Sequence, residues 1–132
     1  MSKVLTSSFG YPKIGESREL KKALEAYWAG KISKEEFFNQ VEEVNLSRLK
    51  KQKDAGIDLI ASNDFSLYDS MLDLSIMFGI ISERFADIKD TTDLYFAMAR
   101  GADNAVACEM TKWFDTNYHY IVPEINGKFD LR

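Results

Sequence analysis

The chain has 132 residues, 45% of them hydrophobic and 29% charged, a composition typical of one soluble globular domain. Its net charge of -4 argues against a general nucleic-acid or anionic-membrane binder, because such proteins present a basic face. A single cysteine excludes a disulfide within the chain, and the absence of a signal-peptide pattern or of an apolar stretch long enough to span a membrane predicts a cytoplasmic protein.

The first half of the sequence predicts two strands and two helices. They are expected as a strand at residues 4–9, helices over 17–30 and 33–56, and a second strand in the run IDLIASND. Ser17 stands at the position of an N-cap for the first helix, and Gly30 at its C-terminal stop. Ser33 and Glu36 have capping-box spacing, which marks the start of the second helix.

The second half predicts two or three helices and a last strand. The segment SLYDSMLDLSIMFG has helical apolar spacing, and a further helix is expected at about residues 92–100. NAVACEMTKWFDTN places Val106, Met110, Trp113 and Phe114 on one side of another helix, and YHYIVPEI reads as a strand. Strands separated by helices pair in parallel, so the chain is expected to be α/β, with three parallel strands and helical crossovers. Three such strands leave two open edges, which predicts the first third or so of a larger barrel.

The helix over 17–30 carries its cations at an unfavourable end. Arg18, Lys21 and Lys22 lie in its first turns beside one acidic residue, Glu19, although the helix dipole already makes this end positive. Arg18 and Lys21 lie one turn apart, so together with the N-terminal amides they would form a site for carboxylates. From the residues alone, a solvated helix face is the simpler interpretation.

Several motifs resemble those of the cobalamin-independent methionine synthase family. They are FGYPKIG, RELKKALEAYWAGKIS, AGIDLIASNDFSLYD and EMTKWFDTNYHYIVPE, in order from about Phe9 to Pro123. The resemblance implies two (β/α)8 barrels, with residues 1–132 forming the first three β/α units of the N-terminal, folate-binding barrel. The C-terminal barrel, with zinc, the homocysteine site and the catalytic histidine, has no counterpart in this chain.

The resemblance also implies the binding residues. The family segment that matches Arg18, Glu19, Leu20 and Lys21 binds the triglutamate tail of the folate, and the lysine that matches Lys112 contacts the same substrate. From the residues alone, Lys112 near the end of a helix would suit the dipole without any ligand. Two separate basic positions, one at Arg18 and Lys21 and one at Lys112, suit an extended polyanionic tail.

Four other polar residues have open roles. Asn63 and Asp64 would either orient a ligand at the end of a strand or cap the next helix, and capping is the favoured interpretation. Asn117 and His119 present a similar choice, in which a lone histidine near an aromatic strand is more typical of packing than of catalysis. Cys108 is expected to be a small buried residue in the middle of a helix. With one cysteine and one histidine, the chain is expected to hold no metal site and no catalytic residue.

Two functional hypotheses follow. In the first, the chain is the N-terminal portion of an enzyme that transfers a methyl group from 5-methyltetrahydropteroyltriglutamate to homocysteine, with the C-terminal barrel as its partner and zinc bound there; the chain alone would be inactive. In the second, it is a free-standing, non-enzymatic module that binds polyglutamyl folate or another small anion. A third reading is a barrel fragment that self-associates through its open sheet edges. None of them involves nucleic acid or a membrane.

Overall fold

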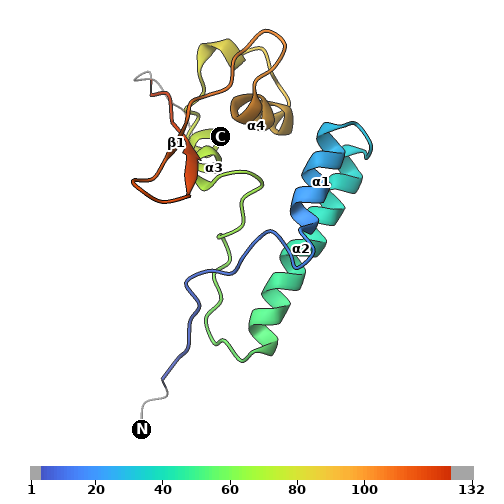
Figure 1. Ribbon diagram of the computed structural model, residues 1–132, viewed down its shortest axis with the longest axis vertical. Coiled ribbons are helices and arrows are strands. Elements are labelled where there is room, and N and C mark those ends of the chain that lie inside the picture. Colours follow the sequence, from blue (N-terminus) through green and yellow to red (C-terminus); the bar gives the residue numbers. More distant parts are fainter. Residues whose placement is uncertain (1–3, 126–132) are drawn as a thin grey trace. The chain divides into compact units, whose positions relative to one another are not determined.

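A computed structural model of the chain describes residues 4–125 and divides it into two compact units, Met1–Leu67 and Tyr68–Arg132 (Figure 1). The first unit holds α1 (Glu19–Trp28) and α2 (Lys34–Asp54). The second holds α3 (Ser70–Met77), the short 3₁₀ helix η1 (Glu83–Phe85), α4 (Thr91–Arg100), β1 (Met110–Lys112) and β2 (His119–Ile121). Over the residues that the structure describes, none of the helices combines the length and apolar character needed to cross a membrane.

The first unit is built on the packing of α1 against α2. Its core comes from both helices, with Leu20, Ala23, Leu24, Phe37 and Val41 buried. Tyr27 of α1 stacks on Phe37 of α2 with ring centroids 4.7 Å apart. The predicted stop at Gly30 is confirmed, because this residue has a φ of 65° and its N–H donates to the carbonyl of Tyr27. The capping box at the start of α2 is confirmed as well.

The prediction of parallel barrel units is wrong. The described residues contain one sheet, and its two strands are antiparallel. The segments expected as the first two strands share only an isolated parallel bridge between Ser7 and Leu59. Beside this bridge, the Asp58 carboxylate accepts the N–H of Thr6 at 3.0 Å and the Thr6 hydroxyl accepts the N–H of Asp58 at 3.1 Å. The side chains of Thr6 and Asp58 thus accept hydrogen bonds from backbone N–H groups that a longer ladder between the two segments would use. The predicted self-association through open sheet edges stays a prediction.

The second unit packs α3 against α4 and β2. Three predicted elements are confirmed here: the helix in SLYDSMLDLSIMFG by α3, the helix at about residues 92–100 by α4, and the last strand by β2. The helix predicted around Val106 and Met110 is wrong, because Met110–Lys112 is a strand paired with His119–Ile121. The expected apolar stripe is not a buried face, since Val106 is 78% and Phe114 80% exposed. The β-branched and aromatic residues of this segment suit a hairpin better than a helix.

A buried carboxylate, Asp69, connects the elements of the second unit. It is 4% exposed and caps α3 by accepting the N–H of Leu72 at 3.1 Å. The same carboxylate accepts the N–H of Ile121 in β2 at 3.0 Å and the hydroxyl of Tyr118 at 2.8 Å. The Tyr95 hydroxyl of α4 accepts the Asp69 N–H at 3.3 Å, so three elements meet at this residue.

We expect Asp69→Ala to lower the free energy of unfolding by about 2 to 4 kcal/mol, because it removes a helix cap and leaves two buried donors without an acceptor. Asp90→Ala is the matched control: Asp90 caps α4 by accepting from Thr92 and Asp93, but these bonds are exposed, so a loss of about 1 kcal/mol is expected. Urea unfolding followed by circular dichroism measures both. Equal losses would contradict the central role of Asp69.

Candidate functional site

The backbone at the start of α1 differs from the predicted cap. The N-cap is Arg18, not Ser17, and it has left-handed dihedral angles, φ 60° and ψ 40°. The Ser17 N–H donates to the carboxylate of Glu19 at 3.0 Å. Gly15 permits this arrangement, because a Cβ there would lie 2.0 Å from a carboxylate oxygen of Glu19. The chain therefore places one of its own carboxylates at the positive end of the helix.

The N-terminal amides of α1 are only partly occupied by the chain itself. Besides the Ser17 N–H, the N–H of Arg18 donates to the carbonyl of Gly15 at 3.3 Å, and that of Leu20 donates to the carbonyl of Ile14 at 3.1 Å. Within residues 4–125, the first-turn N–H groups of Glu19 and Lys21 have no hydrogen-bond acceptor. The contribution of free amides to an anion site stays a prediction.

The four predicted residues of α1 have different environments. Arg18 is exposed, and its side chain has no hydrogen bond or ion pair within residues 4–125. Lys21 is exposed and lies 3.7 Å from the carboxylate of Glu25, a weak pair one turn along the helix. Leu20 is 3% exposed and belongs to the core. Arg18 and Lys21 are therefore the available cations, and the strained backbone of Arg18 costs roughly 1 to 2 kcal/mol.

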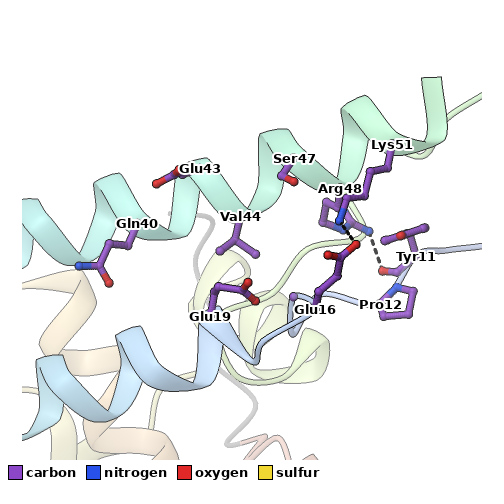
Figure 2. Close-up of a pocket in the computed structure, with 11 residues that line it drawn as sticks. Tyr11, Pro12, Glu16, Glu19, Gln40, Glu43, Val44, Ser47, Arg48 and Lys51 are labelled. Carbon is purple, nitrogen blue, oxygen red and sulfur yellow. Dashed lines mark hydrogen bonds and ion pairs between the residues drawn. The ribbon is translucent and has the colours of Figure 1, made fainter. Parts of the chain in front are cut away.

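A cleft of about 510 Å³ lies between the segment before α1 and the side of α2 (Figure 2). Its acidic lining residues are Glu16, Glu19 and Glu43, and its basic ones are Arg48 and Lys51. Lys51 is paired with Glu16, and this contact lowers the pKa of the glutamate. The available cations Arg18 and Lys21 do not line the cleft. It is therefore a poor site for a polyanion.

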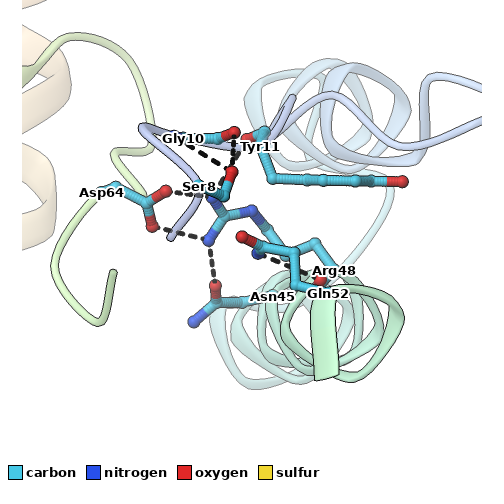
Figure 3. A network of polar contacts seen from close by, with 7 residues as sticks. All are labelled: Ser8, Gly10, Tyr11, Asn45, Arg48, Gln52 and Asp64. Carbon is cyan, nitrogen blue, oxygen red and sulfur yellow. Dashed lines mark hydrogen bonds and ion pairs between the residues drawn. The ribbon is translucent and has the colours of Figure 1, made fainter. Parts of the chain in front are cut away.

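The segment that precedes α1 is held by an ion pair between a buried arginine and a partly exposed aspartate (Figure 3). Arg48 of α2 is 3% exposed and binds both carboxylate oxygens of Asp64, at 2.8 and 2.5 Å. Its guanidinium also donates to the carbonyl of Tyr11 at 3.0 Å and to the side chain of Asn45 at 3.1 Å. The hydrogen bonds from Arg48 lower the pKa of Asp64. One side chain thus joins α2 to two irregular segments.

The sequence did not lead us to Arg48 as a structural residue, and the role predicted for Asp64 differs from the observed one. The favoured interpretation of Asp64 as a helix cap is wrong, since it pairs with Arg48 and the cap of α3 is Asp69. A signal was available: Arg48 follows Val41 and Val44 at helical spacing, on the stripe that faces the core. An arginine on such a stripe requires a buried acidic partner.

Lys112 lies in the second unit, on a strand and not at the end of a helix. It is exposed, and within residues 4–125 its ammonium has no hydrogen bond or ion pair. Its partner across the hairpin is His119, whose Nδ1 lies 2.9 Å from the carbonyl oxygen of Asn117. Lys112 belongs to a different compact unit from Arg18 and Lys21.

The single cysteine is buried, as predicted, but it is not in a helix. Cys108 is 5% exposed and its N–H donates to the carbonyl of Met98 at 2.8 Å. Burial, together with the nearby carboxylate of Glu124, raises the pKa of its thiol to about 11. Among residues 4–125, no three side chains of histidine, cysteine, aspartate or glutamate gather in a way that would hold a metal ion.

Comparison with known proteins gives a consistent result. Residues 5–132 match the family model described as "Cobalamin-independent synthase, N-terminal domain". Relatives named 5-methyltetrahydropteroyltriglutamate–homocysteine methyltransferase are 60% identical over 94% of the chain in Streptococcus mutans, 54% over 93% in Halalkalibacterium halodurans and 50% over 100% in Bacillus subtilis. The matches cover 16%, 16% and 17% of these relatives, so the chain spans about a sixth of their length.

Replacing Arg48 by alanine is expected to destabilise the first unit by about 3 to 5 kcal/mol, because Asp64 then loses the partner that compensates its desolvation. Lys50→Ala is the matched control on the same helix: its ion pair with Asp54 is exposed, so a change below about 0.5 kcal/mol is expected. Denaturant titration of the helical signal gives both values. Similar effects of the two substitutions would contradict a structural role for Arg48.

The lowered pKa of Asp64 predicts acid sensitivity. Because its pKa is lower in the folded chain than in the unfolded one, where it is about 3.9, the pair contributes stability above that value and loses it as the pH falls through the folded pKa. Unfolding free energies measured from about pH 6 down to about pH 2 should therefore fall, and this fall should be smaller in Asp64→Asn. An unchanged acid profile in that variant would contradict the assignment.

Proposed function

Since this chain belongs to the cobalamin-independent methionine synthase family, as the match to the N-terminal domain shows, we propose that it is the N-terminal portion of a methyltransferase. The whole enzyme would transfer the methyl group of 5-methyltetrahydropteroyltriglutamate to homocysteine, the substrates that the names of the relatives give. This portion would bind the glutamate tail of the folate. The observation that carries the role is the pair of exposed cations, Arg18 at the N-cap of α1 and Lys21 in its first turn.

Each predicted residue would contribute in a different way. Arg18 and Lys21 would bind tail carboxylates through their side chains, and Lys112 would add a third cation from the second unit. Glu19 would shape the turn, since its carboxylate holds the N–H of Ser17. Leu20 would anchor this turn of α1 in the core and make no side-chain contact with the ligand.

Methyl transfer itself needs groups that this chain does not present. A zinc ion that activates a thiol is held by three or more protein ligands, and the sequence has one histidine and one cysteine. Cys108 is buried beside the ion pair of Arg84 and Glu124, with a raised pKa, and it is poorly suited to bind a metal. We therefore assign no step of the reaction to these residues and expect zinc to be bound by the rest of the enzyme.

Calorimetric titration with 5-methyltetrahydrofolates that carry one or three glutamates tests the binding role. The chain should prefer the longer tail, and the preference should fall by roughly fivefold for each cation lost in Arg18→Ala, Lys21→Ala and Lys112→Ala. Lys50→Ala, whose lysine is paired with Asp54, is the control and should leave the preference unchanged. Added salt should weaken binding of the longer tail more than that of the shorter. Equal affinity for both folates would refute the proposed role.

Complementation distinguishes an enzyme portion from a free-standing binding module. The chain is mixed with a separately produced protein that supplies the remainder of a relative, and methionine formation is measured. A portion of the enzyme should restore activity in the mixture and show none alone. Folate binding without any complementation would favour the free-standing module.

A further inference from the structure

The outer edge of β1 carries backbone hydrogen-bonding groups that the hairpin does not use. The Val122 N–H donates to the Glu109 carbonyl at 2.8 Å, which makes these two residues a hydrogen-bonded pair at one end of the hairpin. In antiparallel strands, hydrogen-bonded and non-hydrogen-bonded pairs alternate. By the observed register, Met110 and Lys112 then belong to non-hydrogen-bonded pairs, and their N–H and C=O groups point away from β2. We call these four groups the open edge of β1.

The opposite edge of the hairpin has a partner from within the chain. Ile121 pairs with Met110, so its N–H points outward from β2, where it donates to the carboxylate of Asp69 at 3.0 Å. Within residues 4–125, the backbone of Met110 and Lys112 makes no hydrogen bond outside the hairpin. An exposed strand edge of this kind is a template for pairing with a further strand. The hairpin can therefore be extended on the side of β1.

Exposed apolar side chains lie on β1 and immediately after it. Met110 is 45% and Trp113 53% exposed, and Phe114 is more exposed still. The rings of Trp113 and Phe114 pack edge to face, with centroids 5.0 Å apart. Side chains next to a strand edge contact those of the strand that pairs with it, and aromatic residues contribute most to such contacts. The open edge therefore suits an added strand with apolar side chains.

The two strands of the hairpin have unequal support. Each has three residues, and β2 packs on α3, whereas the outer backbone groups of β1 have no partner within residues 4–125. Sheets become stable with three or more strands or with a helix packed against them. The relatives contain further polypeptide that can supply a strand, because the matches cover only 16% and 17% of the relatives from Streptococcus mutans and Bacillus subtilis.

We propose that the open edge of β1 pairs with an extended segment from the part of the enzyme that lies outside this match. The inference rests on the proposed function, because it treats the chain as one portion of a longer enzyme. The added segment forms backbone hydrogen bonds with Met110 and Lys112 and places apolar side chains against Trp113 and Phe114. These bonds use the backbone of Lys112, so its ammonium stays available to a ligand.

Amide hydrogen exchange tests the pairing on intact proteins. In the free chain, the amides of Met110 and Lys112 should exchange rapidly, while that of Ile121, which is bonded to Asp69, should be slower. In the full-length relative from Streptococcus mutans, the amides that align with Met110 and Lys112 should exchange roughly 100-fold more slowly than in the chain. Equally rapid exchange in both proteins would overturn the inference. Slow exchange in the chain alone at high concentration would also overturn it, because the occupant would then be a second copy.

Two substitutions at one position separate the backbone from the side chain. Met110→Pro removes the outward N–H but keeps the bonds between β1 and β2, because proline is tolerated on the outer edge of a strand. Met110→Ala, the matched control, keeps that N–H. In the complementation mixture, Met110→Pro should raise the chain concentration for half-maximal methionine formation by roughly tenfold, and Met110→Ala by about twofold. Slow exchange of the Ile121 amide in free Met110→Pro shows that the hairpin is retained.

The same assay distinguishes failure of this inference from failure of the proposed function. Equal complementation by Met110→Pro and Met110→Ala would refute the strand pairing and leave the proposed function intact. No complementation even by the unsubstituted chain would refute the proposed enzyme portion and the pairing with it.

Discussion

The ion pair between Arg48 and Asp64 holds together a region that has almost no regular secondary structure. Residues 4–18 and 57–67 contain no helix, and the pairing between them is limited to one bridge. Neither segment has a ladder of hydrogen bonds to fix it against α2. The guanidinium replaces that ladder, because its five donors lie in a fixed plane and reach the Asp64 carboxylate and the Tyr11 carbonyl at once. Because Arg48 is buried, loss of its acidic partner would leave an uncompensated charge in the interior, which makes that loss costly.

The ion pair between Arg48 and Asp64 also bears on why cations lie at the N-terminus of α1, where the helix dipole is unfavourable for them. The segment from Tyr11 leads into the turn at Gly15, where the carboxylate of Glu19 accepts the N–H of Ser17. That internal carboxylate offsets the positive end of α1, so Arg18 does not face an uncompensated dipole. Arg18 lies just outside the helix in a left-handed conformation, with its side chain exposed. The turn therefore leaves the guanidinium of Arg18 exposed, where a ligand could reach it.

Short sequence motifs correctly predicted helix ends that depend only on residues close in the sequence. The capping box of Ser33 and Glu36 and the stop at Gly30 mark real helix ends. The prediction of a helix around Met110 was wrong. Its apolar residues fit helical spacing, but their β-branched and aromatic neighbours favour a strand, and spacing alone does not decide between the two. The order of elements predicted a parallel sheet, but the side chains of Thr6 and Asp58 end the pairing after one bridge. Arg48 was missed because its partner lies 16 positions away, although its place on the apolar stripe was readable.

The charged groups that stabilise this chain and the cations proposed to bind a ligand have different environments. The stabilising groups are paired and largely buried, as in Arg48 with Asp64 and in Asp69 with its backbone donors. The cations proposed to bind the ligand are exposed, and each contributes at most roughly 1 kcal/mol in water. A single cation of this kind would barely distinguish one glutamate from three. A preference for the longer tail would therefore need more than one cation, so we propose that Arg18 and Lys21 act together on neighbouring carboxylates and that Lys112 provides a separate contact.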